Sequence, residues 1–219
     1  MRFVVKLSLA VLIALGGYLF WPRSSSLSSF DAAAMAELQT SAWRHAAVDK
    51  EAQALFGLYS IFEGQYRIPP LPAIPAAMNM LQARRAFASA ADQADEEQAL
   101  PFLEKTFSIL GEKTGANFDP TIIARLELFT WSLARDTSKQ SQLTAAISEK
   151  LALLHGGAAK DYRECSSDFA RAARLTAAKN WSAATQAGTT AWQKLRRQID
   201  STGQRAADPS TGSSRSSQL

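Results

Sequence analysis

Apolar residues recur every three or four positions along most of the chain, which is the period of an α-helix with one buried face. The first such stretch begins at Ser29 or Asp31, either of which can cap a helix, and runs to about Arg67 with a weak middle at 45–50. Six further stretches predict helices that begin near Pro75, Pro101, Pro120, Ser138, Tyr162 and Asn180. The pattern therefore predicts an all-α domain over residues 30–200, with about seven helices in antiparallel pairs.

Proline and glycine mark the expected ends of these helices. Residues 68–75 are rich in proline, which predicts an extended connector followed by a helix with Pro75 in its first turn. The dipeptide Asp119-Pro120 combines a cap with a first-turn proline, and Gly115 and Gly156 follow periodic stretches as helix stops.

Helical hairpins of about 35 to 40 residues approach the period of tetratricopeptide repeats. Phe107 and Leu110-Gly111 fit the opening of that pattern, but Thr114 stands where tyrosine belongs and Ile123 where a small residue belongs. The sequence leaves two arrangements open, an irregular bundle and a repeat-like helical array.

An uncharged apolar run, 7–21, follows the basic residues Arg2 and Lys6. It fits a signal-anchor, a single transmembrane helix with the N-terminus in the cytoplasm. A cleaved signal peptide is the alternative, but the run ends in bulky residues where a cleavage site needs small ones. Residues expected within the membrane include Leu7, Leu12, Tyr18, Phe20 and Trp21.

Polar segments flank the predicted domain, a tether at 24–29 and a disordered tail at 201–219. The chain has a net charge of +4, yet residues 24–200 contain equal numbers of basic and acidic residues, 19 of each. The basic character therefore belongs to the flanks, and a neutral domain argues against nucleic-acid binding.

Metal, cofactor and catalytic motifs are not found in the sequence. The two histidines, His45 and His155, lack the Glu-x-x-His spacing of di-iron bundles and the His-Glu-x-x-His of zinc proteases. We interpret His45 as half of a helix-surface pair with Asp49, and His155 as a cation near a helix C-terminus. Cys165, the single cysteine, is interpreted as a buried thiol, with an intermolecular disulfide as the alternative.

Tryptophans and one acidic residue interrupt the regular pattern. Glu127 lies within an apolar helix and predicts a partly buried salt bridge. Four tryptophans of the body are expected to pack between helices: Trp43, Trp131, Trp181 and Trp192. A candidate interaction surface combines Trp192 with nearby bases, namely Lys194, Arg196 and Arg197.

These patterns predict a protein without enzymatic activity. The first hypothesis is a membrane-tethered scaffold that binds another envelope protein, with the domain outside the inner or plasma membrane, in the periplasm of a bacterial cell. The alternative is a secreted helical domain that binds a small ligand in a pocket lined by tryptophan and tyrosine.

Overall fold

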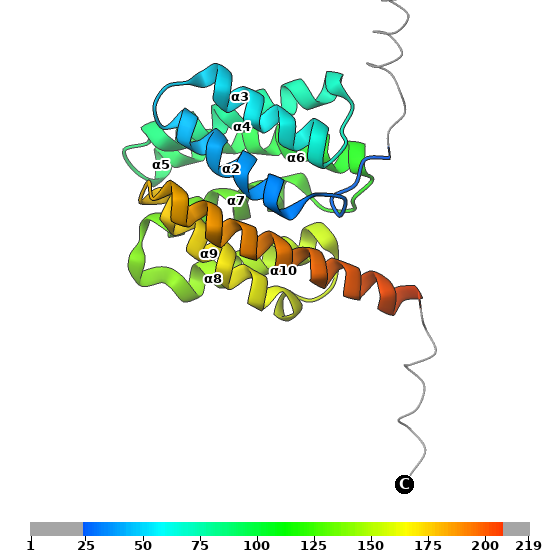
Figure 1. Ribbon diagram of the computed structural model, residues 1–219. Coiled ribbons are helices and arrows are strands. Elements are labelled where there is room, and N and C mark those ends of the chain that lie inside the picture. Colours follow the sequence, from blue (N-terminus) through cyan, green and yellow to red (C-terminus); the bar gives the residue numbers. More distant parts are fainter. Residues whose placement is uncertain (1–23, 208–219) are drawn as a thin grey trace, which may run out of the picture.

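The computed structural model describes residues 24–207, which contain eight α-helices of ten residues or more and no strand (Figure 1). They are α2 (Ala32–Ala46), α3 (Glu51–Ser60), α4 (Pro70–Ser89), α6 (Leu100–Thr114), α7 (Pro120–Arg135), α8 (Gln140–His155), α9 (Arg163–Ala177) and α10 (Trp181–Ala207). Five short elements link them: η1 (Ile61–Gln65), α5 (Gln93–Glu96), η2 (Glu97–Ala99), η3 (Thr137–Lys139) and η4 (Ala159–Tyr162). The all-α prediction is confirmed.

The predicted membrane segment, 1–23, lies outside the described residues, as does the end of the predicted tail, 208–219. Within 24–207, none of the helices combines the length and the apolar character needed to cross a membrane.

The eight long helices of the described residues pack one after another into a closed ring. Each packs against the long helix before it and the one after it, and α10 packs against both α9 and α2, so the last helix meets the first. In Figure 1, helices α2, α3, α4 and α6 form one side of this ring and α8, α9 and α10 the other, with α7 between them. The helices therefore form a closed bundle in which the two ends of the succession are joined.

Small residues allow the closest approaches between helices. A Cβ atom added to Gly188 of α10 would lie 3.4 Å from the Cβ of Ala36 in α2, and one added to Gly57 of α3 would lie 3.1 Å from the Cβ of Ala42. Both helices beside α2 can therefore pack tightly against it, which brings the ends of the succession together.

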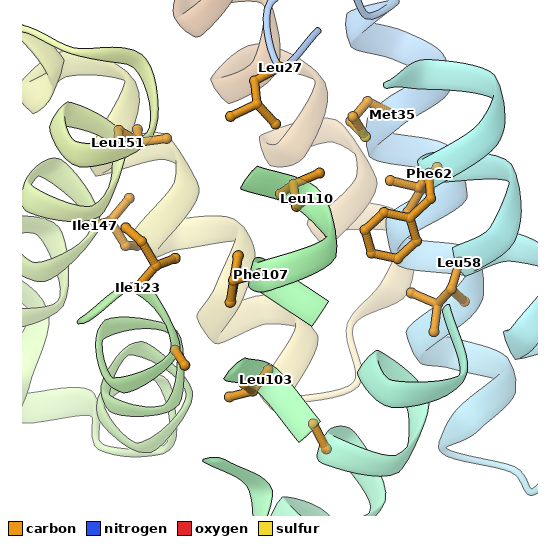
Figure 2. Packing of buried hydrophobic residues seen from close by; sticks show 14 of the residues in the cluster. Leu27, Met35, Leu58, Phe62, Leu103, Phe107, Leu110, Ile123, Ile147 and Leu151 are labelled. Atoms are coloured by element: carbon orange, nitrogen blue, oxygen red, sulfur yellow. The ribbon is translucent and has the colours of Figure 1, made fainter. Parts of the chain in front are cut away.

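Helix α6 contributes side chains to the centre of the hydrophobic core. Figure 2 shows its residues Phe107 and Leu110 between Ile147 of α8 on one side and Met35 and Phe62 on the other. These side chains are 8% exposed or less, so the core is continuous from α2 to α8.

The predicted extended connector at 68–75 was wrong for most of its length, because α4 begins at Pro70. The first turn of a helix has no internal partner for its N–H groups, so prolines there remove no hydrogen bond. Pro70 is the first helical residue, and the N–H of Ala73 already donates to the carbonyl of Pro69 at 3.1 Å. Pro75, expected at the helix start, lies inside α4.

The first predicted helix, from Asp31 to Arg67, is two helices. Asp31 caps α2 as predicted, with its side chain accepting from the N–H of Ala34 at 2.7 Å. The chain then reverses after Ala46, where Asp49 adopts a left-handed conformation with φ 57°. No glycine marks this turn, so the periodicity alone predicted only a weak point.

Both flanking predictions need correction where the structure describes them. The expected tether at 24–29 is packed, with Leu27 only 6% exposed and Ser26 donating its N–H to the carbonyl of Tyr66. The expected disordered tail starts too early, because α10 continues to Ala207. Extending an existing helix fixes only one residue for each new hydrogen bond, so a polar continuation can remain helical.

Candidate functional site

A cavity of about 600 Å³ lies inside the ring of helices. Residues from all eight long helices line it, so the closure of α10 onto α2 is what encloses the space. Much of the lining is aliphatic or aromatic. All four tryptophans that were predicted to pack between helices belong to it: Trp43, Trp131, Trp181 and Trp192.

One end of the cavity opens to solvent. Every exposed residue of the lining belongs to this end: Ala47, Asp49, Arg85, Ala88, Arg135, Ala177 and Lys179. They come from the α2–α3 turn, the C-terminal ends of α4, α7 and α9, and the α9–α10 turn, at the left of Figure 1 where α10 begins. Asp49 and Lys179, one in each turn, both have φ 57°.

The opposite end is closed by the segment before α2. Leu27 lines the cavity there and is buried. The segment is held by side chains from other elements: Arg196 of α10 donates to the carbonyl of Ser28 at 2.8 Å, and Gln65 accepts the N–H of Asp31 at 2.9 Å. Within residues 24–207, this segment therefore covers the end of the cavity that lies opposite the mouth.

Arg84 of α4 places a cation in the cavity wall near the mouth. Its guanidinium carbon lies 5.3 Å from the ring centre of Trp131 and 5.5 Å from those of Trp43 and Phe87. Within residues 24–207, Arg84 has no ion pair within 4.0 Å and no hydrogen bond. Burial, followed by repulsion from Arg135, lowers the pKa of Arg84 to about 10 against a smaller opposing attraction by Glu127, so it remains charged at pH 7.

Glu127 of α7 forms a compact polar group next to Arg84. It pairs with Lys150 of α8, and each of these two side chains is 16% exposed. The indole N–H of Trp131 donates to the other carboxylate oxygen at 2.8 Å. The salt bridge predicted for Glu127 is confirmed, and the pair satisfies both charges within the cavity wall.

Arg135 lies at the mouth and is also satisfied. Its guanidinium donates to Glu96 at 3.1 Å and to the carbonyl of Phe87 at 2.9 Å, and it lies 3.9 Å from the centre of the Phe87 ring. Tyr66 lines the cavity as well, where burial followed by the charge of Glu127 raises the pKa of its hydroxyl. It therefore presents a neutral hydroxyl.

The prediction that His155 is a cation at the end of α8 was wrong. The ring borders the cavity, its Nδ1 is buried without a hydrogen-bond partner in the described structure, and burial lowers its pKa to about 4. The imidazole is neutral at pH 7. The helix end is completed instead by the Tyr162 hydroxyl, which donates to the carbonyl of Gly156 at 2.6 Å.

We expect this buried imidazole to make folding sensitive to mild acid. The folded state holds the His155 pKa near 4, while the unfolded state has the ordinary value of about 6.5, so the unfolded chain takes up the proton first as the pH falls. Stability should be complete above pH 6.5 and decrease by about 3 kcal/mol towards pH 4. Urea unfolding of the wild type and His155→Phe across this range measures it; equal pH slopes in the two proteins would contradict the expectation.

The structure does not bring the predicted interaction surface together. Trp192 faces the core between Phe30 and Phe169, each at 5.0 Å between ring centres. Lys194 pairs with Glu164 and Asp168 at 2.9 Å, which leaves little free charge. Arg196 bonds to Ser28 and Phe30 and pairs with Asp200, whereas Arg197 is exposed.

Cys165 and His45, which the sequence also singled out, do not belong to a catalytic or metal-binding group of residues. The Cys165 thiol is buried, as interpreted, and burial raises its pKa to about 11. Within the described residues, His45 and Asp49 form no ion pair within 4.0 Å, and the His45 Nδ1 is buried without a hydrogen-bond partner, so the expected pair is wrong. Among residues 24–207, no cluster of three or more histidine, cysteine or acidic residues could hold a metal ion.

Comparison with other proteins provides no relative: no family model matches the chain, and neither a curated protein nor a solved structure matches it. The site must be interpreted from its own residues. Sequence reasoning singled out Glu127 and the tryptophans but missed Arg84. The sequence does contain a signal for Arg84, because Arg84 and Arg85 interrupt the apolar stripe of their helix.

Proposed function

We propose that this protein binds a small, largely apolar molecule in the central cavity and does not transform it. The observation that carries the proposal is a cavity of about 600 Å³ that residues of all eight long helices line. Ligand pockets of about 300–1,000 Å³ have this character, with apolar walls and a few polar groups that set orientation. Arg84, Tyr66 and the Glu127–Lys150 pair are the polar groups here.

Photoaffinity labelling of the full-length protein tests this proposal. The probe is a neutral dodecanol that carries a diazirine, which reacts with whatever side chains surround it when it is illuminated. Peptide mass spectrometry should find the label on lining helices, for example on the α9 segment that contains Phe169 and Ala173. Because the probe is neutral, the result does not depend on any charge in the cavity.

A filled cavity provides the matched comparison. Ala173→Phe adds a ring at a lining position of α9 and should lower the labelling about tenfold or more, since the volume that it occupies is taken from the ligand. Ala145→Phe makes the same change at an exposed position of α8 outside the lining and should leave labelling unchanged. Label spread evenly over the surface, with equal yields in all three proteins, would refute the proposal.

The sequence supports attachment of this domain to a membrane through residues 1–23. We propose an uncleaved anchor with the helical domain on the extracytoplasmic side, with secretion after cleavage as the alternative. N-terminal sequencing of the mature protein from fractionated cells decides between them. An intact Met1 in the membrane fraction supports the anchor, and a soluble protein that starts near Leu27 supports cleavage.

Binding of another envelope protein is the second candidate function. The observation in its favour is an apolar stripe on the outer side of α4, where Leu71, Ile74 and Met78 are 46%, 46% and 45% exposed. Their spacing suits one amphipathic helix of a partner. Crosslinking in intact membranes should capture one partner with the wild type and lose it with Met78→Glu. Capture that is the same with both proteins would exclude this stripe.

A further inference from the structure

We infer that the cavity binds the carboxylate of an amphipathic monoanion, with Arg84 as its counter-ion and the apolar body of the ligand towards the closed end. This inference rests on the proposed function and specifies the class of ligand. It depends on one cation, Arg84, that forms no ion pair and no hydrogen bond within the described part of the protein.

The guanidinium of Arg84 has hydrogen-bond donors that the surrounding side chains do not satisfy. A guanidinium has five N–H donors, and a buried charge is ordinarily paired and hydrogen-bonded. Trp43, Phe87 and Trp131 offer their ring faces, which attract a cation but accept no strong hydrogen bond. Since Arg84 borders the cavity, an acceptor that enters through the mouth can satisfy it.

The charges around Arg84 indicate the charge of the ligand group that would pair with it. Glu127 and Lys150 form one ion pair, and Arg135 and Glu96 form another. Glu127 also attracts Arg84, but its carboxylate is already paired with Lys150, so the group keeps one net positive charge that one negative charge would balance. A carboxylate carries a single charge and presents two oxygens in the plane that matches the fork of a guanidinium.

The position of Arg84 indicates the direction of the ligand. Arg84 precedes Arg85 and Ala88, which lie at the mouth, so the charged end of a ligand would lie close to solvent. The closed end is lined by Leu27, Leu110 and Leu154, which suit an apolar chain. Such a ligand buries its tail and keeps its head next to the cation. Its carboxylate would also raise the pKa of Arg84 back towards the ordinary value.

Competition against the neutral diazirine probe tests the inference in the full-length protein. Two competitors share one apolar chain and differ in the head, dodecanoate and dodecanol. For each, the concentration that halves the labelling is measured in the wild type and in Arg84→Gln, and their ratio expresses the preference for the anion. Partition of the competitors into lipid cancels, because the same pair is compared between proteins.

We expect Arg84→Gln to reduce the preference for dodecanoate about tenfold to hundredfold, the range for loss of a hydrogen-bonded charge. Dodecanol should compete equally well in both proteins. Arg125→Gln is the matched control, because Arg125 is exposed on α7 outside the lining, and it should behave as the wild type.

The outcomes separate the two proposals. If the probe labels the cavity but the preference is the same in the wild type and Arg84→Gln, the anionic ligand is refuted and ligand binding stands. If the probe never labels the cavity, the proposed function fails and this inference fails with it. Should Arg84→Gln not fold, Arg84→Met makes the same test with an apolar side chain of similar length, and a preference reduced less than about threefold overturns the inference.

Discussion

Replacing Lys150 with methionine should destabilise the protein by about 3 kcal/mol. The change leaves Glu127 in the cavity wall without its cation, and an uncompensated charge in a largely enclosed site costs about 3–5 kcal/mol. The lower end of that range applies because both side chains retain 16% exposure towards the cavity. Urea denaturation at pH 7 measures the loss as a shift of the midpoint at unchanged slope.

A double variant shows whether the loss comes from the unpaired charge or from poor packing. Adding Glu127→Gln to Lys150→Met removes the carboxylate but leaves an amide oxygen to accept from the Trp131 indole. This double variant should recover to within about 1 kcal/mol of the wild type, because replacing both members of a buried pair is often nearly neutral. If it stays as unstable as the single variant, the loss reflects packing of the Lys150 chain.

Local chemistry explains which parts of this fold the sequence could predict. Asp119 caps α7 by accepting from the N–H of Thr121 at 2.8 Å, Gly115 ends α6 with φ 67°, and Asn180 accepts from Ala183 at the start of α10. Each of these signals depends on residues within four positions of one another. The start of α4 at Pro70 was missed because a proline is tolerated in the first turn of a helix but disrupts later turns. The sequence alone did not show in which turn each of these prolines lies.

The ring and its cavity depend on contacts that local patterns do not contain. The approach of Gly188 to Ala36 joins segments about 150 residues apart, and the periodicity of α2 and α10 is the same whether or not they touch. Trp192 was predicted both to pack between helices and to form a surface with nearby bases, and its indole donates to Gln39 of α2 at 3.3 Å inside the ring. Arg84 gained its significance only when three aromatic rings from α2, α4 and α7 were placed around it.

Replacing Phe87 with alanine should cost about 4 kcal/mol of stability. The side chain is 2% exposed and packs against Trp131 at 5.4 Å between ring centres. Removing a buried phenylalanine loses its transfer free energy and leaves a void, which together cost about 3–5 kcal/mol. Arg84 and Arg135 would also lose the ring face that each contacts. Thermal and urea unfolding measure the change.

Phe56→Ala is the matched control, since it deletes the same side chain at a position that is 69% exposed and should change stability by less than about 0.5 kcal/mol. A loss below 1 kcal/mol for Phe87→Ala would show that the cavity wall at Phe87 is not tightly packed. Phe87→Leu extends the argument, because it restores much of the volume without the aromatic face. If it recovers stability but weakens the preference for dodecanoate over dodecanol, the ring acts on Arg84 by orienting the guanidinium as well as by filling space.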